Sequence, residues 1–126
     1  MEEDIRYWVD LAKYDLKTAD AMLKSRRYLY VLFTCQQAIE KMLKALVVKV
    51  NQEFPPRTHD LLRLAQITRI NVSDEQRELL GKLSFYYIET RYPEEVYEIS
   101  RSISRKIASE YLNRTEEIFT WLRKKM

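Results

Sequence analysis

Glycine, cysteine and histidine are nearly missing from this chain of 126 residues, in which each occurs once. A single glycine cannot build the glycine-rich loop that cradles phosphates in many nucleotide-binding proteins. A lone cysteine excludes an internal disulfide, and one cysteine with one histidine cannot form a zinc site of the usual type. The glutamate–histidine pairs at i,i+3 that a di-iron bundle needs are also missing. The sequence therefore predicts no metal and no cofactor.

Long apolar runs are missing too. The longest apolar stretches, such as residues 45–48, are far shorter than the roughly 20 residues that a membrane-spanning helix needs. Residues 1–4 lack the basic start and the apolar stretch of a secretion signal. We therefore expect no membrane location, and the predicted compartment is the reducing cytoplasm.

The residues that are abundant favour helix. Proline occurs only three times, whereas alanine, leucine, glutamate, lysine, arginine, methionine and glutamine, which all have high helix propensity, are common. The length suits one continuous hydrophobic core and is too short for two. The composition predicts a single all-α domain over residues 1–126.

Apolar residues recur at helical spacing in five segments. The spacing predicts helices over about residues 3–25, 28–50, 59–69, 73–90 and 101–124. The fourth of these is expected to bury Leu79, Leu80, Leu83 and Tyr87 in the core. The expected architecture is an up-and-down bundle of four long helices plus one short helix.

Breaks and caps define these segments. The adjacent Pro55 and Pro56 disfavour helix and make the main break. Thr58 is expected to cap the short third helix, and Ser73, with a glutamine three residues later, is expected to open the fourth with a capping box. Pro93 is expected to stop the fourth helix and to leave an irregular segment over residues 91–95.

Charge is unevenly distributed although the net charge is only +3. Residues 1–25 and 73–100 are acidic, whereas residues 26–50 and 101–126 are basic. Two interpretations stay open: either acidic and basic helices are neighbours, or the two basic segments share a face for phosphates.

The second helix carries small residues and the single cysteine. Thr34, Ala38 and Ala45 share a face on which another helix or a second subunit can approach closely. Cys35 lies within the apolar stripe of the same helix, so we predict an inert core residue rather than a nucleophile.

Three motifs follow one another along the chain: residues 35–46 (CQQAIEKMLKAL), residues 58–61 (THDL) and residues 91–93 (RYP). In this order and spacing they resemble the compact prokaryotic proteins of the HEPN family. The opening over residues 7–19 is similar to the first helix of that family, so the resemblance covers nearly the whole chain.

The resemblance implies a helical bundle that commonly dimerises and is often encoded beside a minimal nucleotidyltransferase, sometimes as a toxin with its antitoxin. Many relatives are metal-independent ribonucleases. Their signature is an arginine followed after four to six residues by a histidine, which together reach one phosphate across a dimer. The only histidine here is His59, and residues 52–54, where that arginine would stand, are Gln, Glu and Phe. The signature is absent.

A substitute catalytic pair can be argued from chemistry. Metal-free RNA cleavage needs a proton acceptor, a proton donor and a cation on the phosphate. His59 can act as a general acid or as a general base near neutral pH, and the guanidinium group of Arg91 can bind two phosphate oxygens. In the competing interpretation His59 bonds locally at a helix start, and Arg91 pairs with Glu94 or Glu40.

Gln36, Glu40 and Lys44 lie on successive turns of the second helix. Together with His59 and Arg91 they are candidates to line a groove that binds a nucleotide or RNA. In this groove Lys44 would contact a phosphate. The alternative is an ordinary i,i+4 ion pair from Glu40 to Lys44 on a solvated face. Tyr92 is a candidate to stack on a base, although tyrosines at this spacing more often pack in a core or an interface.

These observations support two main hypotheses. In the first, the chain is a HEPN-type subunit of an intracellular two-component system, pairs with itself and with a minimal nucleotidyltransferase, and binds nucleotide or RNA in a groove. In the second, it is a metal-independent ribonuclease toxin that uses His59 and Arg91. A purely structural role as an assembly subunit is a third.

Overall fold

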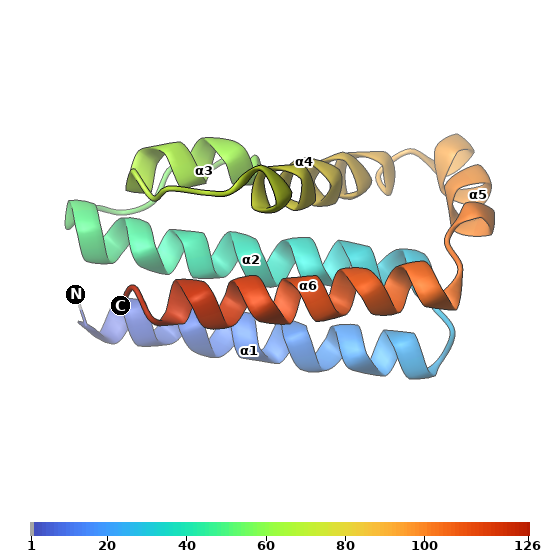
Figure 1. Ribbon diagram of the computed structural model, residues 1–126, viewed down its shortest axis with the longest axis horizontal. Coiled ribbons are helices and arrows are strands. Elements are labelled where there is room, and N and C mark those ends of the chain that lie inside the picture. Colours follow the sequence, from blue (N-terminus) through green and yellow to red (C-terminus); the bar gives the residue numbers. More distant parts are fainter. Residues whose placement is uncertain (1) are drawn as a thin grey trace.

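The computed structural model describes residues 2–126, which form six α-helices and no strand (Figure 1). The helices are α1 (Glu2–Lys24), α2 (Tyr28–Asn51), α3 (Leu61–Thr68), α4 (Asp74–Glu89), α5 (Pro93–Ser102) and α6 (Arg105–Arg123). In Figure 1, α1 and α4 run one way along the long axis and α2 and α6 run the other way, while α5 lies across one end. The all-α prediction is confirmed.

Helix α2 is the centre of the bundle. Most of its residues between Val31 and Val48 are buried, because α1, α3, α4, α5 and α6 all pack against it. A helix with apolar side chains around most of its circumference is stable only when it is surrounded in this way. Among residues 2–126, no helix combines the length and the apolar character that crossing a membrane would require.

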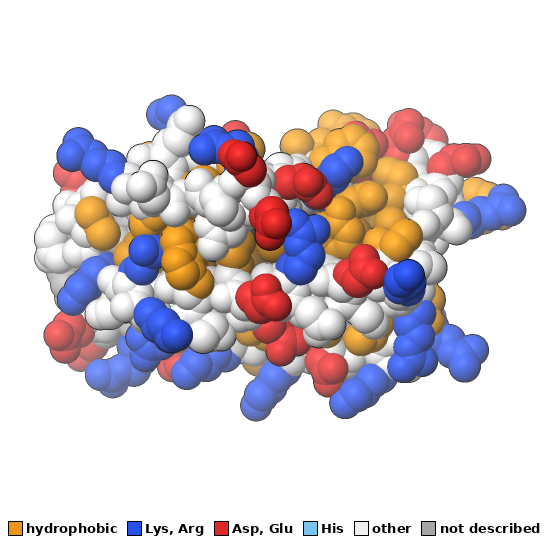
Figure 2. All heavy atoms as spheres, viewed as in Figure 1, with side chains coloured by type: hydrophobic (Ala, Val, Ile, Leu, Met, Phe, Trp, Pro, Cys, Tyr) orange, Lys and Arg blue, Asp and Glu red, His pale blue; other side chains and the backbone are white. Residues whose placement is uncertain are grey.

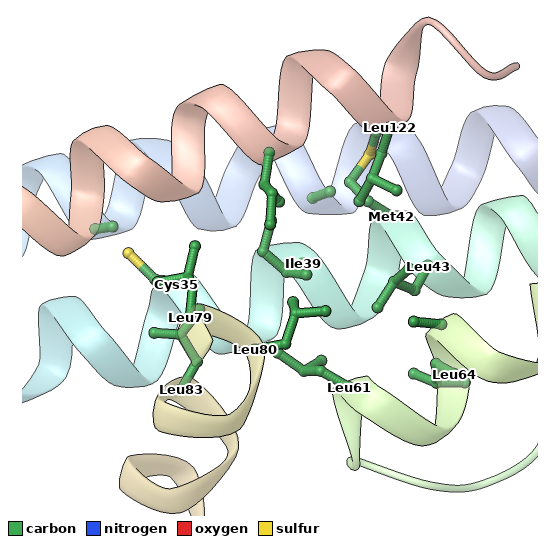
Figure 3. Packing of buried hydrophobic residues seen from close by; sticks show 14 of the residues in the cluster. Cys35, Ile39, Met42, Leu43, Leu61, Leu64, Leu79, Leu80, Leu83 and Leu122 are labelled. Carbon is green, nitrogen blue, oxygen red and sulfur yellow. The ribbon is translucent and has the colours of Figure 1, made fainter. Parts of the chain in front are cut away.

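The core is one cluster that joins α1, α2, α3, α4 and α6, and Figure 3 shows part of it. Helix α2 contributes Cys35, Ile39, Met42 and Leu43, and the facing side chains are Leu61, Leu64, Leu79, Leu80, Leu83 and Leu122. Burying a leucine of this kind contributes about 1.5–3 kcal/mol. The predicted burial of Leu79, Leu80, Leu83 and Tyr87 on the fourth helix is confirmed.

The capping box of α4 is confirmed. The Ser73 hydroxyl accepts from the backbone N–H of Gln76 at 3.1 Å, and the Gln76 side chain accepts from the backbone N–H of Ser73 at 2.8 Å. The predicted cap of the short third helix was wrong. Asp60, not Thr58, caps α3, because its carboxylate accepts from the backbone N–H groups of Leu62 and Arg63.

The count of four long helices plus one short helix was also wrong. Pro93 does not leave an irregular segment but occupies the first position of α5, where its fixed φ suits a helix and its missing N–H costs nothing. The predicted last helix starting at residue 101 is therefore divided, because α5 ends at Ser102 and Ser104 caps a separate α6 by accepting from the N–H of Ile107.

The small residues and the cysteine of α2 face the inside of the chain. Ala38 and Ala45 have no exposed surface. Other helices of the same chain, rather than a second subunit, therefore cover this face at the two alanines. Cys35 is equally buried, and burial raises the pKa of its thiol to about 12. Its predicted place in the core is confirmed.

Candidate functional site

A buried polar ladder runs along the middle of α2. Gln36, Glu40 and Lys44 follow one another at i,i+4 spacing, and their exposed fractions are 0%, 5% and 8%. The side-chain amide of Gln36 donates to Glu40 Oε1 at 3.0 Å, and Lys44 Nζ donates to Glu40 Oε2 at 3.0 Å. The i,i+4 pair predicted from the sequence is present, but it is buried rather than on a solvated face.

Gln36 also ties α2 to the loop before α3. Its amide nitrogen donates a second hydrogen bond, at 2.9 Å, to the backbone carbonyl of His59. Its amide oxygen accepts from the side chain of Gln37 at 2.8 Å. Both hydrogens and the oxygen of this amide are therefore used, as a buried polar group requires. The loop that carries His59 is held in place by its backbone.

Glu40 orients the imidazole of His59. The Nδ1 atom of His59 lies 2.8 Å from Glu40 Oε1. Burial alone would raise the pKa of the Glu40 carboxyl, but hydrogen bonds from Gln36, Lys44 and His59 outweigh burial and hold this pKa below its ordinary value. An ionised carboxylate only accepts, so Nδ1 carries the hydrogen of this bond. The other ring nitrogen is left for a ligand, and 49% of the His59 side chain is exposed.

Arg91 joins the site through Tyr87 of α4. Its guanidinium donates to the hydroxyl of Tyr87 at 2.8 Å and lies 4.8 Å from the centre of the Tyr87 ring. The ring of His59 lies 4.9 Å from the same ring, and Phe33 stacks on it at 5.1 Å. Tyr87 is buried whereas Arg91 is exposed. One fixed aromatic ring thus holds an exposed imidazole and an exposed guanidinium near each other.

The structure brings five of the six candidate residues together. Gln36, Glu40 and His59 are joined directly, Lys44 through Glu40, and Arg91 through Tyr87. The competing interpretation describes neither residue correctly. The His59 ring bonds to Glu40 rather than locally, and the described partner of Arg91 is a tyrosine rather than an acid. The sixth candidate, Tyr92, is 48% exposed beside Arg91.

Lys44 lies beneath the surface rather than at the rim of a groove. Its amine is paired with Glu40 and lies 5.7 Å from the ring centre of Trp8. Its contacts with Glu40 make it a support for the carboxylate that orients His59. The exposed cation at the site is Arg91.

Sequence reasoning missed the part played by Tyr87. The residue was assigned to the core face of its helix, which is correct, but its hydroxyl and ring also connect Arg91 with His59. The spacing of Tyr87 and Arg91, four residues, would have placed them on one face had the helix been expected to continue. Nothing in the spacing could have shown that Phe33 reaches the same ring.

Both His59 and Arg91 are exposed. Hollows elsewhere, one between the start of α1 and the C-terminal end of α6 and one alongside α6, are lined by neither residue. Among residues 2–126, no three histidine, cysteine, aspartate or glutamate side chains come together in a way that could hold a metal ion. The chemistry that this arrangement offers is proton transfer by an oriented imidazole and recognition of an anion by a guanidinium.

Comparisons with known proteins identify the family. None of the curated proteins matches the chain significantly. The crystal structure of TT1696 from Thermus thermophilus is similar, with a TM-score of 0.82 and 27% identity, over 97% of this chain and 98% of that chain. An archaeal HEPN homologue, ST0689, shares the fold with a TM-score of 0.77 and 24% identity, over 96% of each chain. The model of the HEPN domain matches residues 5–125. Since this match takes in every helix of the bundle and all six candidate residues, the chain belongs to the HEPN family.

Proposed function

We propose that the protein is a HEPN subunit that binds RNA or a nucleotide through its phosphate at the surface formed by His59 and Arg91. One observation carries the proposal: Glu40 orients a half-exposed imidazole, and Arg91 presents its guanidinium beside the same Tyr87 ring. A guanidinium held by one hydrogen bond keeps its other N–H groups for phosphate oxygens. The protonated imidazole would add a second donor.

Binding of a short oligoribonucleotide at low salt tests this proposal. We expect Arg91→Gln to weaken binding about tenfold or more, because a charge-assisted hydrogen bond to phosphate is lost. The slope of log K against log salt should also fall by about 0.7, the value for one phosphate contact on a single strand. The control is Arg6→Gln, which removes an exposed arginine of α1. Equal affinity of wild type and Arg91→Gln would refute the assignment.

A second function is favoured by the Glu40–His59 hydrogen bond. A buried carboxylate that fixes an imidazole is the arrangement that general acid–base catalysis needs. His59 would take the proton of a 2′-hydroxyl as its oxygen bonds to phosphorus, or give a proton to the leaving 5′-oxygen as its bond to phosphorus breaks. Arg91 would balance charge on the phosphate oxygens. The chain would then cleave RNA without the arginine–histidine signature of its relatives.

Cleavage of single-stranded RNA in the presence of a chelator tests this second function. His59→Ala and Arg91→Ala should each abolish most of the activity, and Glu40→Gln should reduce it while keeping the shape of the site. Absence of wild-type cleavage, or cleavage that is unchanged in both alanine variants, would exclude His59 and Arg91 as a catalytic pair. The binding function would survive that result.

The proposed partners are a second copy of the chain and a minimal nucleotidyltransferase, with a toxin–antitoxin pair as one form of the system. The motifs shared with the family support the nucleotidyltransferase. Exposed apolar side chains support self-association. Figure 2 shows hydrophobic side chains gathered over α4, which carries the exposed Phe85 and Ile88, and Tyr97 of α5 is also exposed. Light scattering after size exclusion tests the dimer, and co-purification with the product of a neighbouring nucleotidyltransferase gene tests the other partner.

A further inference from the structure

A row of aromatic rings leads away from His59 along α2. The ring of His59 contacts Tyr87 at 4.9 Å, Tyr87 stacks on Phe33 at 5.1 Å, and Phe33 meets Tyr30 edge-on at 6.3 Å. The middle of the row, at Phe33 and Tyr87, is packed into the protein, whereas its two ends are exposed: 45% for Tyr30 and 49% for the His59 side chain. The row therefore fixes two exposed rings at a set separation.

That separation can be judged from α2 itself. Tyr30 lies on α2, and His59 is bonded to Glu40, ten residues further along the same helix. At about 1.5 Å per residue the two ends of the row are about 15 Å apart along the axis. A ligand that reaches both must be several nucleotides long.

Positive charge accompanies the Tyr30 end of the row. Arg26 and Arg27 immediately precede α2 and are exposed. The backbone N–H of Tyr30 donates to the carbonyl of Arg27, so these two residues are one turn apart. Within residues 2–126 neither arginine forms an ion pair, and the first turn of α2 has no acid. Lysine and arginine side chains gather at the end of the bundle where Figure 1 places this turn (Figure 2).

The exposed tyrosines near Arg91 lie where acids outnumber bases. Tyr92 and Tyr97 belong to the α5 region, where Glu94, Glu95 and Glu98 are exposed and the one base of the helix, Arg101, lies 5.5 Å from the Tyr97 ring. A polyanion is therefore attracted more strongly at Arg26 and Arg27 than along α5. Charge favours the start of α2 as the next contact of a strand bound at His59.

We propose that Tyr30, Arg26 and Arg27 form a second subsite for an unpaired RNA strand whose first contact is the His59 and Arg91 surface. Tyr30 stacks on a base, and the arginines hold the phosphates beside it. Bases inside a duplex are covered by their neighbours and cannot lie on the Tyr30 ring, so the strand is single. The inference rests on the proposed function, since it extends that surface by one subsite.

The experiment compares a diuridylate, which fits the His59 end alone, with an octauridylate, which is long enough to reach both ends. Wild type should bind the octauridylate more tightly than the diuridylate. Tyr30→Ala should lower affinity for the longer strand by about tenfold or more, the effect of losing one stacked base, and leave diuridylate binding unchanged. Tyr30→Phe keeps the ring and should bind like wild type. Tyr14→Ala removes a tyrosine that is 71% exposed on α1 and serves as the matched control.

The outcomes separate the two proposals. If Tyr30→Ala and wild type bind the octauridylate equally well, the subsite is overturned. It is also overturned if wild type binds duplex RNA as tightly as it binds the single strand. Loss of self-association in Tyr30→Ala, with RNA affinity unchanged, also overturns it by showing a protein interface. Diuridylate binding that depends on Arg91 supports the proposed function whatever Tyr30 does. Octauridylate binding that needs Tyr30 but not Arg91 refutes the proposed function, and it overturns the subsite as an extension of the His59 surface although Tyr30 stacks on a base.

Discussion

The carboxylate of Glu40 and the imidazole of His59 are hydrogen-bonded at 2.8 Å although the two residues lie 19 positions apart in the sequence. Glu40 is buried in the central helix, and His59 belongs to the loop before α3. Gln36 fixes the same loop a second time, through the His59 carbonyl. Both the backbone and the ring of His59 are therefore held from α2, which gives an exposed imidazole a defined direction.

Replacing Gln36 with methionine tests how much this fixation contributes to stability. Gln36→Met keeps an unbranched side chain of similar length but removes the donors to Glu40 and to the His59 carbonyl. We expect a loss of about 1–3 kcal/mol in the free energy of unfolding, the cost of leaving buried polar groups without partners. Urea denaturation measures it. Gln66→Met, at an exposed glutamine of α3, should stay within about 0.5 kcal/mol of wild type.

The lowered pKa of Glu40 predicts a dependence of stability on pH. The folded protein holds this pKa below the ordinary value of 4.5, so the ionised carboxylate stabilises the fold above that pH. This contribution is lost as pH falls through the lower pKa of the folded state. Unfolding of wild type and Glu40→Gln should therefore differ most near neutral pH and least in acid. A difference that is constant over this range would contradict the assignment of the shift to Glu40.

Lys44 and Lys24 each form an i,i+4 ion pair with an acid, but the two pairs differ in burial, so they allow a matched comparison of stability. Lys44 pairs with Glu40, with 10% and 6% of the two side chains exposed, whereas Lys24 pairs with Asp20, with 76% and 52% exposed. Lys44→Met should cost about 3 kcal/mol, the lower end for breaking a buried pair, because other donors to Glu40 remain. Lys24→Met should cost about 1 kcal/mol or less. Equal losses in denaturant titrations would show that burial does not strengthen the Glu40 pair.

The helices could be predicted because their signals are local. The apolar spacing along α2 and the Ser73 cap of α4 each depend on residues within a few turns, and both predictions hold. Pro93 shows the limit of this approach, since proline favours the first position of a helix as well as the end of one. Only packing decides between these two roles of a proline. Because α5 has no buried residue, the sequence carries little apolar signal for it.

The sequence could predict which residues form the candidate site but not which contacts join them. The motifs pointed to Gln36, Glu40 and His59, which the fold does join. The burial of Lys44 could not be foreseen, because it depends on Trp8 and on helices distant in the sequence. Nor could the link from His59 to Arg91, because it passes through a tyrosine assigned to the core.

Weak packing makes α5 the helix most ready to open. None of its ten residues is buried, and Tyr92 at its N-cap supplies no side-chain hydrogen bond. Local unfolding requires little free energy where few apolar contacts are lost. Native-state hydrogen exchange should therefore show amides of α5 exchanging by local opening, far faster than those in the middle of α2. Protection of α5 equal to that of α2 in the purified protein would contradict this prediction and would indicate that a second copy covers α5.

The thiol of Cys35 should report global unfolding. The side chain has no exposed surface, and burial raises its pKa to about 12, so at pH 8 almost none of it is the reactive thiolate. A coloured disulfide reagent should react at a rate set by unfolding of the whole bundle, because α2 is enclosed by the other helices. When closing is faster than labelling, variants that destabilise α2, such as Gln36→Met, should raise the logarithm of the reaction rate in proportion to their loss of free energy of unfolding. Rapid labelling of the native protein, independent of these variants, would show that α2 opens locally.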